Sequence, residues 1–180
     1  MSRRSVDILG SGLAGLGAAL SLARLGIPSR VVRRARPSAV GPSLVLNDVS
    51  LELLAEFLPR EELEARGVPL QGRFVKWASE RPTRIKGRGL AIETAALLEL
   101  VEAACRNRRE IDIVETVEAR PAWTLIAGRH EGPGGEADPR PSLVAGDRVL
   151  ISTRVHLLDD RPLDAYRVES VPAGWLMLLP

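Results

Sequence analysis

A short, largely apolar run begins at residue 6 and is followed by a longer stretch in which Ala and Leu recur at helical spacing. Residues 6–9 form a run suited to a buried strand, and the following stretch ends at Gly26, a residue suited to a left-handed helix cap. Residues 29–32 are again short and largely apolar. A strand, a helix and a strand in this order predict a βαβ unit with parallel strands.

The middle of the chain changes period more than once. Residues 38–46 form a loop leading into an apolar pair, and Asn47 or Asp48 is a suitable N-cap for a helix to about Leu58, followed by a charged helical turn at 60–66. Residues 72–79 and 84–90 alternate apolar and polar positions, which predicts a β-hairpin outside the parallel sheet.

The pattern then returns to helix and strand. Thr94 can cap a helix over 95–107 with a broad apolar face, and residues 111–117 follow as a third strand of the parallel sheet. Repetition of strands and helices predicts a doubly wound α/β fold. Residues 128–141 have no periodicity and read as a loop, whereas 149–158 and 165–180 predict a β-meander belonging to a second, antiparallel sheet.

Composition narrows the class of protein. Apolar residues make up 45% of the 180 residues and charged residues 27%, as in ordinary globular proteins. The net charge of +2 arises from arginines interspersed with 23 acidic residues, and aromatic residues are only 3%, so nucleic acid is not an expected partner. No apolar run is long enough to span a membrane. The single cysteine, Cys105, fits a reducing compartment, and we expect a cytoplasmic protein.

The turn between the first strand and the first helix carries the candidate chemistry. Glycines at positions 10, 12 and 15 have the spacing of a dinucleotide-binding turn. Gly10 allows the tight turn, Gly12 lets the backbone approach a diphosphate, and Gly15 lets the helix pack closely on the strand. Free N–H groups and the helix dipole favour an anion there. The predicted cofactor-binding residues of this turn are Gly10, Ser11, Gly12, Leu13, Ala14 and Gly15.

The end of the second strand departs from this pattern. Sites for FAD and NAD place an acidic residue about twenty positions past the glycines to accept hydrogen bonds from the ribose. Arg33 stands there, followed by Arg34. These arginines either bind a 2′-phosphate, as in NADP sites, or mark a lost ribose contact. We therefore count Arg33 and Arg34 among the candidate cofactor-binding residues.

Four stretches together resemble the FAD-dependent monooxygenases that include the aromatic hydroxylases, relatives of flavin halogenases and geranylgeranyl reductases. The most specific is the glycine turn from Gly10, which is similar to the family's FAD diphosphate turn. The others are 43–54, 94–104 and 168–180. The departures are Arg33, Thr94 where many members have arginine, and 117–123 in place of an Asp-Ala-Thr-Gly strand.

The resemblance implies an FAD-dependent oxidoreductase of monooxygenase type. FAD would be reduced by NADPH or NADH, and one oxygen atom would pass to an apolar small molecule. The FAD-binding domain would comprise 1–70 and 90–127, and a partial substrate-domain sheet would comprise 71–89 and 142–180. The resemblance identifies no catalytic side chain, and no metal site is expected.

Two alternatives remain open at this point. One is an NADP-binding, reductase-like module in which Arg33 and Arg34 bind the 2′-phosphate. The other is a non-catalytic homologue or fragment, since family members are about twice this length. An exposed edge of the C-terminal meander would also favour a homodimer or pairing with a missing C-terminal segment.

Overall fold

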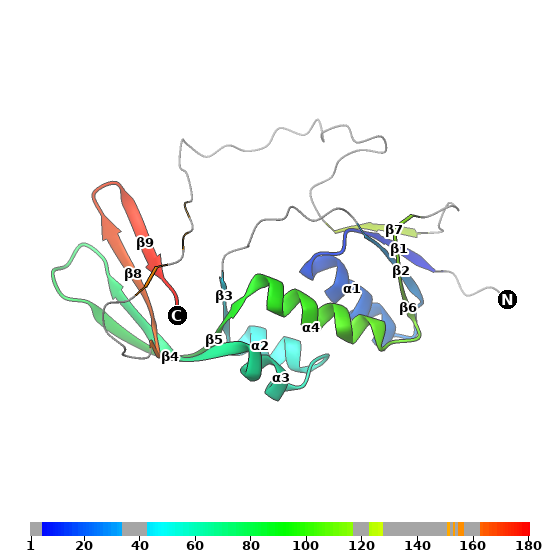
Figure 1. Ribbon diagram of the computed structural model, residues 1–180, viewed down its shortest axis with the longest axis horizontal. Coiled ribbons are helices and arrows are strands. Elements are labelled where there is room, and N and C mark those ends of the chain that lie inside the picture. Colours follow the sequence, from blue (N-terminus) through cyan, green and yellow to red (C-terminus); the bar gives the residue numbers. More distant parts are fainter. Residues whose placement is uncertain are drawn as a thin grey trace. The chain divides into compact units, whose positions relative to one another are not determined.

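The computed structural model describes residues 5–33, 43–116, 123–127, 151, 153, 155–156 and 163–180. Contacts divide the chain into two units (Figure 1). The first comprises Met1–Pro37 with Glu102–His156, and the second comprises Ser38–Val101 with Leu157–Pro180. The division falls inside one helix, so the last part of that helix belongs to the first unit.

The first unit is built on sheet A, a four-stranded parallel sheet in the order β6-β2-β1-β7. Its strands are β1 (Val6–Leu9), β2 (Ser29–Val32), β6 (Ile111–Val114) and β7 (Trp123–Ile126). The chain runs outward from β1 through β2 to β6, and β7 then pairs with the other side of β1. This reversal of direction is typical of a doubly wound sheet, and it makes β1 a central strand.

Helix α1 (Leu13–Arg24) links β1 to β2 and covers the sheet together with the last turn of α4 (Thr94–Arg106). Right-handed crossovers running the same way along a sheet place their helices on the same face. Cys105 Sγ of α4 accordingly lies 3.5 Å from the carbonyl oxygen of Leu16 in α1. Ile8, Val31 and Leu16 are fully buried and form the centre of this core.

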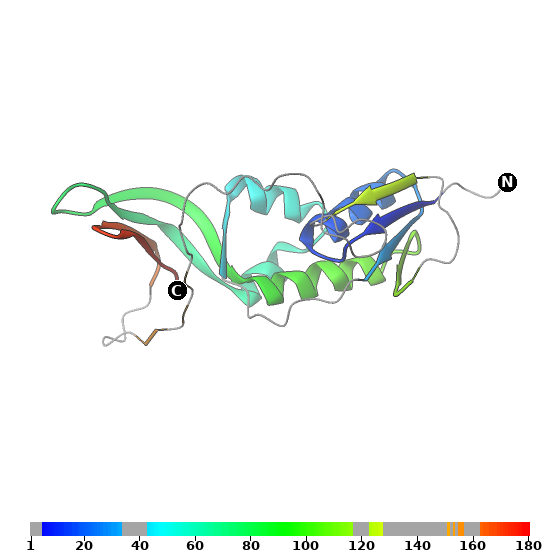
Figure 2. The same cartoon turned by 90° about the horizontal axis from the view of Figure 1, so that it is seen from above.

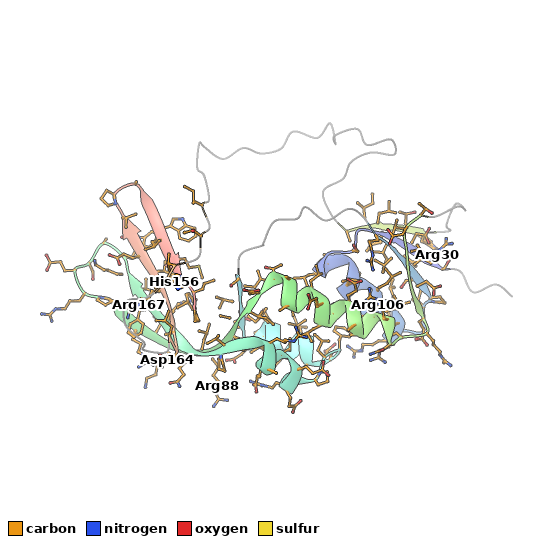
Figure 3. All side chains as sticks on the ribbon, viewed as in Figure 1. Arg30, Arg88, Arg106, His156, Asp164 and Arg167 are labelled. Atoms are coloured by element: carbon orange, nitrogen blue, oxygen red, sulfur yellow. The ribbon has the colours of Figure 1, made fainter. Side chains whose placement is uncertain are left out.

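A charged pair lies among these buried side chains. The Asp7 carboxylate is 1% exposed and faces Arg30 across the paired strands β1 and β2. Arg30, labelled in Figure 3, donates from Nε and Nη2 to the two carboxylate oxygens at 2.7 and 3.0 Å, a bidentate geometry. The arginine therefore compensates the loss of hydration of a buried carboxylate.

The second unit is built on sheet B, in the order β3-β5-β4-β8-β9. Its elements are β3 (Ser43–Asn47), α2 (Asp48–Ala55), α3 (Arg60–Arg66), β4 (Gly67–Lys76), β5 (Thr83–Glu93), β8 (Tyr166–Val171) and β9 (Gly174–Leu178). Strands β4 and β5 form a long curved ribbon (Figure 2). Helix α2 contacts β3 and β5, and α3 contacts β4 and β5. Buried leucines of these helices and strands form the core: Leu46, Leu51, Leu58, Leu63 and Leu90.

A bulge in β5 lies opposite Gln71 of β4. Leu70 pairs with Gly89, but the register shifts before Gly72, which pairs with Lys86. Gly72 has φ +143°, and a Cβ there would lie 2.3 Å from the carbonyl oxygen of Ile85. The position therefore requires glycine. Because the additional residue lies in β5, between Lys86 and Gly89, the alternation along β4 continues and Arg73 lies on the face opposite Leu70.

The predicted fold class is confirmed, and several element bounds differ. Helix α2 ends at Ala55 instead of Leu58, because a turn with Leu58 N donating to Leu54 O leads directly into Pro59 and α3. The second sheet is mixed instead of antiparallel, because β4 and β8 run parallel. The hairpin strands extend further than expected, and β7 was not predicted. The stretch 128–141 lies outside the described residues, and residues 151, 153, 155 and 156 of the expected strand 149–158 are not in a strand.

The Asp7–Arg30 pair gives a testable expectation. Arg30→Met leaves a buried carboxylate without its partner, so we expect the free energy of unfolding to fall by about 3 kcal/mol in urea titrations. The control is Arg60→Met, which removes an exposed ion pair with Glu64 within α3. This variant should leave the free energy of unfolding unchanged within error. Adding Asp7→Leu to Arg30→Met should recover part of the loss. Equal shifts for the two arginine variants would contradict this account.

Candidate cofactor-binding site

The turn after β1 depends on glycine at position 10. Gly10 has φ +125°, and a Cβ there would lie 2.3 Å from the carbonyl oxygen of Ala127. Gly10 N donates to Val32 O at 3.2 Å, and Ala127 N donates to Leu9 O at 2.9 Å. The turn is therefore held between the neighbouring strands β2 and β7, with no room for a side chain.

Gly15 brings the first turn of α1 against the same backbone. A Cβ at Gly15 would lie 1.9 Å from the carbonyl oxygen of Gly10 and 3.3 Å from the Cβ of Ala127. Any larger residue would push the helix off the end of β1. The close approach predicted from the sequence is thus present in the backbone.

Gly12 is different, because the space beside it is open. It is the N-cap residue of α1 and has extended backbone, with φ −80° and ψ −179°, and a Cβ there would meet no heavy atom within 4 Å. No side chain caps the helix, and its first turn has no acidic residue. The first N–H groups of a helix lack intrahelical acceptors, so the amides of Leu13 and Ala14 are available to a ligand.

The location of this open turn fits a dinucleotide. It follows the carboxyl end of β1, at the point where the strand order reverses between β2 and β7. Ligands of doubly wound sheets bind at such reversal points, with a diphosphate on the helix N-terminus. Ser11 in the turn is buried and Ala14 is exposed. The backbone therefore forms an accessible cradle for an anion.

Arg33, at the end of β2, is held by carboxylates of its own unit. Its Nη2 donates to Glu102 Oε1 of α4 at 2.6 Å, and its Nε lies 3.5 Å from Glu115 Oε1. Glu102 is 6% exposed and also accepts from Nη2 of Arg106, which is labelled in Figure 3, at 2.5 Å. The buried carboxylate thus lies between two guanidinium groups. Arg34 lies outside the described residues.

Cys105 lies next to this charged cluster, but its surroundings make it unreactive. The thiol is fully buried. Burial raises the pKa of Cys105 to about 11, and the nearby Glu102 carboxylate adds to the shift. Since the thiolate is the nucleophilic form, Cys105 contributes packing and no chemistry at neutral pH.

The described part of the chain contains neither a candidate metal site nor a candidate membrane-spanning helix. No cluster of three or more His, Cys, Asp or Glu residues there could hold a metal ion. Among the same residues, no helix combines the length and the apolarity that crossing a bilayer requires.

The fold and the glycine turn define an α/β protein of the dinucleotide-binding class. The sequence model of the FAD binding domain matches residues 3–127, which is more than half of the chain. The chain belongs to this FAD-binding family, and FAD is the cofactor that the membership assigns to it. No curated protein matches the sequence.

Solved structures of flavin-dependent monooxygenases have the same fold. The peptidyl tryptophan dihydroxylase QhpG is 17% identical with a TM-score of 0.64, covering 98% of this chain and 42% of its own. The p-nitrophenol 4-monooxygenase PnpA from Pseudomonas putida DLL-E4 is 13% identical with a TM-score of 0.52, covering 61% and 32%. The monooxygenase PieE, solved with FAD and substrate, is 23% identical with a TM-score of 0.50, covering 62% and 23%. The chain spans less than half the length of each.

Two contributors to the site were missed in the sequence. Ala127 follows β7 and lies directly behind Gly10. Residues 123–126 are a short, largely apolar run, which is the signal that could have revealed the strand. Glu102 occurs in the middle of an apolar helix face, between Val101 and Cys105 among the buried residues. An acidic residue within such a face indicates a buried partner, although it does not say which one.

The thiol gives a pH-dependent prediction. With a pKa of about 11, roughly one thiol in a thousand is ionised at pH 8, so iodoacetamide should label native Cys105 very slowly, and faster with rising pH. The unfolded chain ionises nearer pH 8.5 and binds fewer protons above that pH, so the contribution of this group to stability falls between about pH 8.5 and 11. Mass spectrometry with and without urea measures the labelling. Equal rates in both conditions at pH 8 would contradict the burial argument.

Proposed function

We propose that this chain is the FAD-binding part of a flavin-dependent monooxygenase that acts on a small molecule. The observation that carries the proposal is the open, uncapped N-terminus of α1 at the reversal point of sheet A. Membership of the FAD-binding family and the fold of the solved monooxygenases support it. The compared structures are at least twice as long as this chain. The activity is therefore proposed for a protein of their length.

The residues of the turn fit the diphosphate of FAD. Gly12 leaves open space in which the diphosphate can approach the backbone, and the amides of Leu13 and Ala14 point from the helix start. Gly10 and Gly15 have a structural role, because each supports the turn by close backbone contact. When bound, FAD would supply the redox chemistry, with NADPH or NADH as the reductant and O2 as the source of the oxygen atom.

The pairing of Arg33 supports FAD over the NADP alternative. A guanidinium that binds a 2′-phosphate has to offer its donors to that group. Here Arg33 donates to Glu102 and lies close to Glu115, so its charge is already neutralised within the protein. We infer that Arg33 replaces the acidic ribose contact with an ion pair internal to the fold, and that the ribose is held without a carboxylate at this position.

The compartment is inferred from the single cysteine, and the behaviour toward nicotinamide cofactors from the pairing of Arg33. A single cysteine that is fully buried supports a cytoplasmic location. Because Arg33 is engaged, we expect NADPH and NADH to be retained equally poorly by the chain alone.

The cradle is tested by a matched pair of glycine variants. Gly12→Val keeps an allowed extended backbone and places its Cβ where no heavy atom lies within 4 Å. Its side chain fills the space of the diphosphate, so we expect FAD affinity to fall on the order of a hundredfold. Gly17→Ala, inside α1 with open space around it, should raise stability by up to about 1 kcal/mol and leave FAD affinity unchanged. Flavin absorbance after equilibrium dialysis with the purified full chain measures the affinity.

Each result of this experiment distinguishes the proposed function from one of its alternatives. A parent chain that takes up no flavin supports the non-catalytic alternative. A parent chain that retains NADPH tightly and NADH weakly, with no flavin, supports the reductase-like module. Equal flavin binding by the parent and a folded Gly12→Val variant would place the diphosphate elsewhere. Circular dichroism of both variants establishes that they are folded.

A further inference from the structure

An exposed carboxylate lies at the carboxyl end of β6, beside the position where the dinucleotide pattern is broken. Glu115 follows β6 directly, and its side chain is 76% exposed. Strands β6 and β2 pair in parallel, so both end at the same edge of sheet A (Figure 1). The glycine turn after β1 lies at that edge too, because β1 is parallel to β2. Glu115 is therefore on the edge of the sheet that carries the cradle.

The register of β2 and β6 brings Glu115 next to position 33. Val31 pairs with Ile113, and Arg33 N donates to the carbonyl oxygen of Val114 at 2.7 Å, so the ladder continues past the ends of the strands. Positions two apart along a strand point to the same side of a sheet. Arg33 and Glu115 thus follow the same side, and Glu115 Oε1 lies 3.5 Å from Arg33 Nε.

This location matters because the ribose needs an acceptor there. Dinucleotide sites place a carboxylate at the end of the second strand, where it accepts hydrogen bonds from the ribose hydroxyls. Arg33 occupies that position, and a guanidinium can only donate. The carboxylate of Glu115 lies within ion-pair distance of the substituted residue. The neighbouring strand therefore supplies an acceptor where the usual strand has lost it.

The contact with Arg33 leaves the Glu115 carboxylate able to accept. Arg33 Nη2 donates to Glu102 at 2.6 Å, which fixes the guanidinium on α4. Arg33 Nε is buried and has no hydrogen-bond partner among the described residues. Its approach to Glu115 at 3.5 Å is thus an electrostatic contact and uses no hydrogen bond. Both oxygens of Glu115 retain lone pairs for a ligand.

Two other carboxylates of α4 and β6 are not suited to this role. Glu102 is 6% exposed and is held by Arg33 and Arg106. Asp112 is exposed, but it pairs in the register with Arg30 and alternates with Ile113, so it follows the opposite side of the sheet. Glu115 combines exposure with the side and the end of the strand that a ribose contact requires.

We propose that Glu115 accepts hydrogen bonds from the adenosine ribose of the bound cofactor, in place of the acidic residue that is missing at position 33. The two oxygens of a carboxylate match the two neighbouring hydroxyls of a ribose. The inference rests on the proposed function for the identity of the cofactor as FAD. For recognition of an adenosine diphosphate group it rests on the edge of sheet A alone.

The test uses ADP and 2′,3′-dideoxy-ADP, which share the base and the diphosphate and differ only in the ribose hydroxyls. In calorimetric titrations of the full chain, we expect ADP to bind at least about ten times more tightly, because hydrogen bonds to a charged acceptor are lost in the dideoxy compound. Glu115→Ala should weaken ADP binding about tenfold and reduce the affinity ratio of the two nucleotides to below about two. It should lower FAD affinity by a similar factor.

Asp112→Ala is the matched control. It removes an exposed carboxylate from the same strand and changes the net charge of the chain by the same amount. Loss of a negative charge alone favours binding of an anionic diphosphate, so both variants gain the same long-range contribution. Asp112→Ala should nevertheless leave the ratio of the ADP and dideoxy-ADP affinities unchanged within about twofold, because its carboxylate follows the other side of the sheet.

Four results would overturn the proposal. They are the absence of ADP binding, equal affinity of the parent chain for both nucleotides, an unchanged ratio in a Glu115→Ala variant that is folded by circular dichroism, and an equal fall of the ratio in Asp112→Ala.

Flavin uptake, measured by absorbance in the same samples, separates this inference from the proposed function. Uptake of flavin with a ratio that does not depend on Glu115 would refute the inference and sustain the FAD proposal. A Glu115-dependent ratio in a chain that takes up no flavin would sustain the inference and refute the FAD proposal.

Discussion

The close contact between α1 and the end of β1 is the constraint on which the rest of the first unit depends. Gly15 lies against the carbonyl oxygen of Gly10, and Gly10 lies against the backbone of Ala127. These contacts leave no room for side chains, so the helix start is fixed relative to three neighbouring strands. A fixed helix start gives the first amides a constant direction, which is what recognition of a diphosphate requires.

The charge reversal at position 33 shows how one contact can be replaced without loss of the fold. Where the dinucleotide pattern has an acceptor, this chain has a donor, and the donor is satisfied by Glu102 from α4. Glu102 in turn accepts from Arg106, so the buried carboxylate is compensated by two cations. Burying such a cluster costs desolvation free energy, and the ion pairs of Glu102 with both arginines offset that cost. Arg33 thereby connects β2 to α4.

The sequence was sufficient wherever local chemistry decides the structure. The glycine spacing identified the turn at Gly10. The predicted N-cap of α2 is also present, because Ser50 N donates to the side-chain oxygen of Asn47. It was insufficient where distant residues meet. The pairing of β7 with β1, the parallel pairing of β4 with β8, and the contact between Arg33 and Glu102 join residues that no local pattern relates. The roles of the individual turn residues toward FAD stay predictions.

The bulge in β5 has a consequence for changes of length in this region. One residue separates Leu70 from Gly72 in β4, whereas two residues separate their partners Gly89 and Lys86 in β5, so β5 carries the additional residue. Removing one residue between Lys86 and Gly89 would restore a regular ladder and leave every pair on either side in place. Removing Gln71 from β4 would instead enlarge the mismatch. The hairpin therefore accommodates a shorter β5 at this point more readily than a shorter β4.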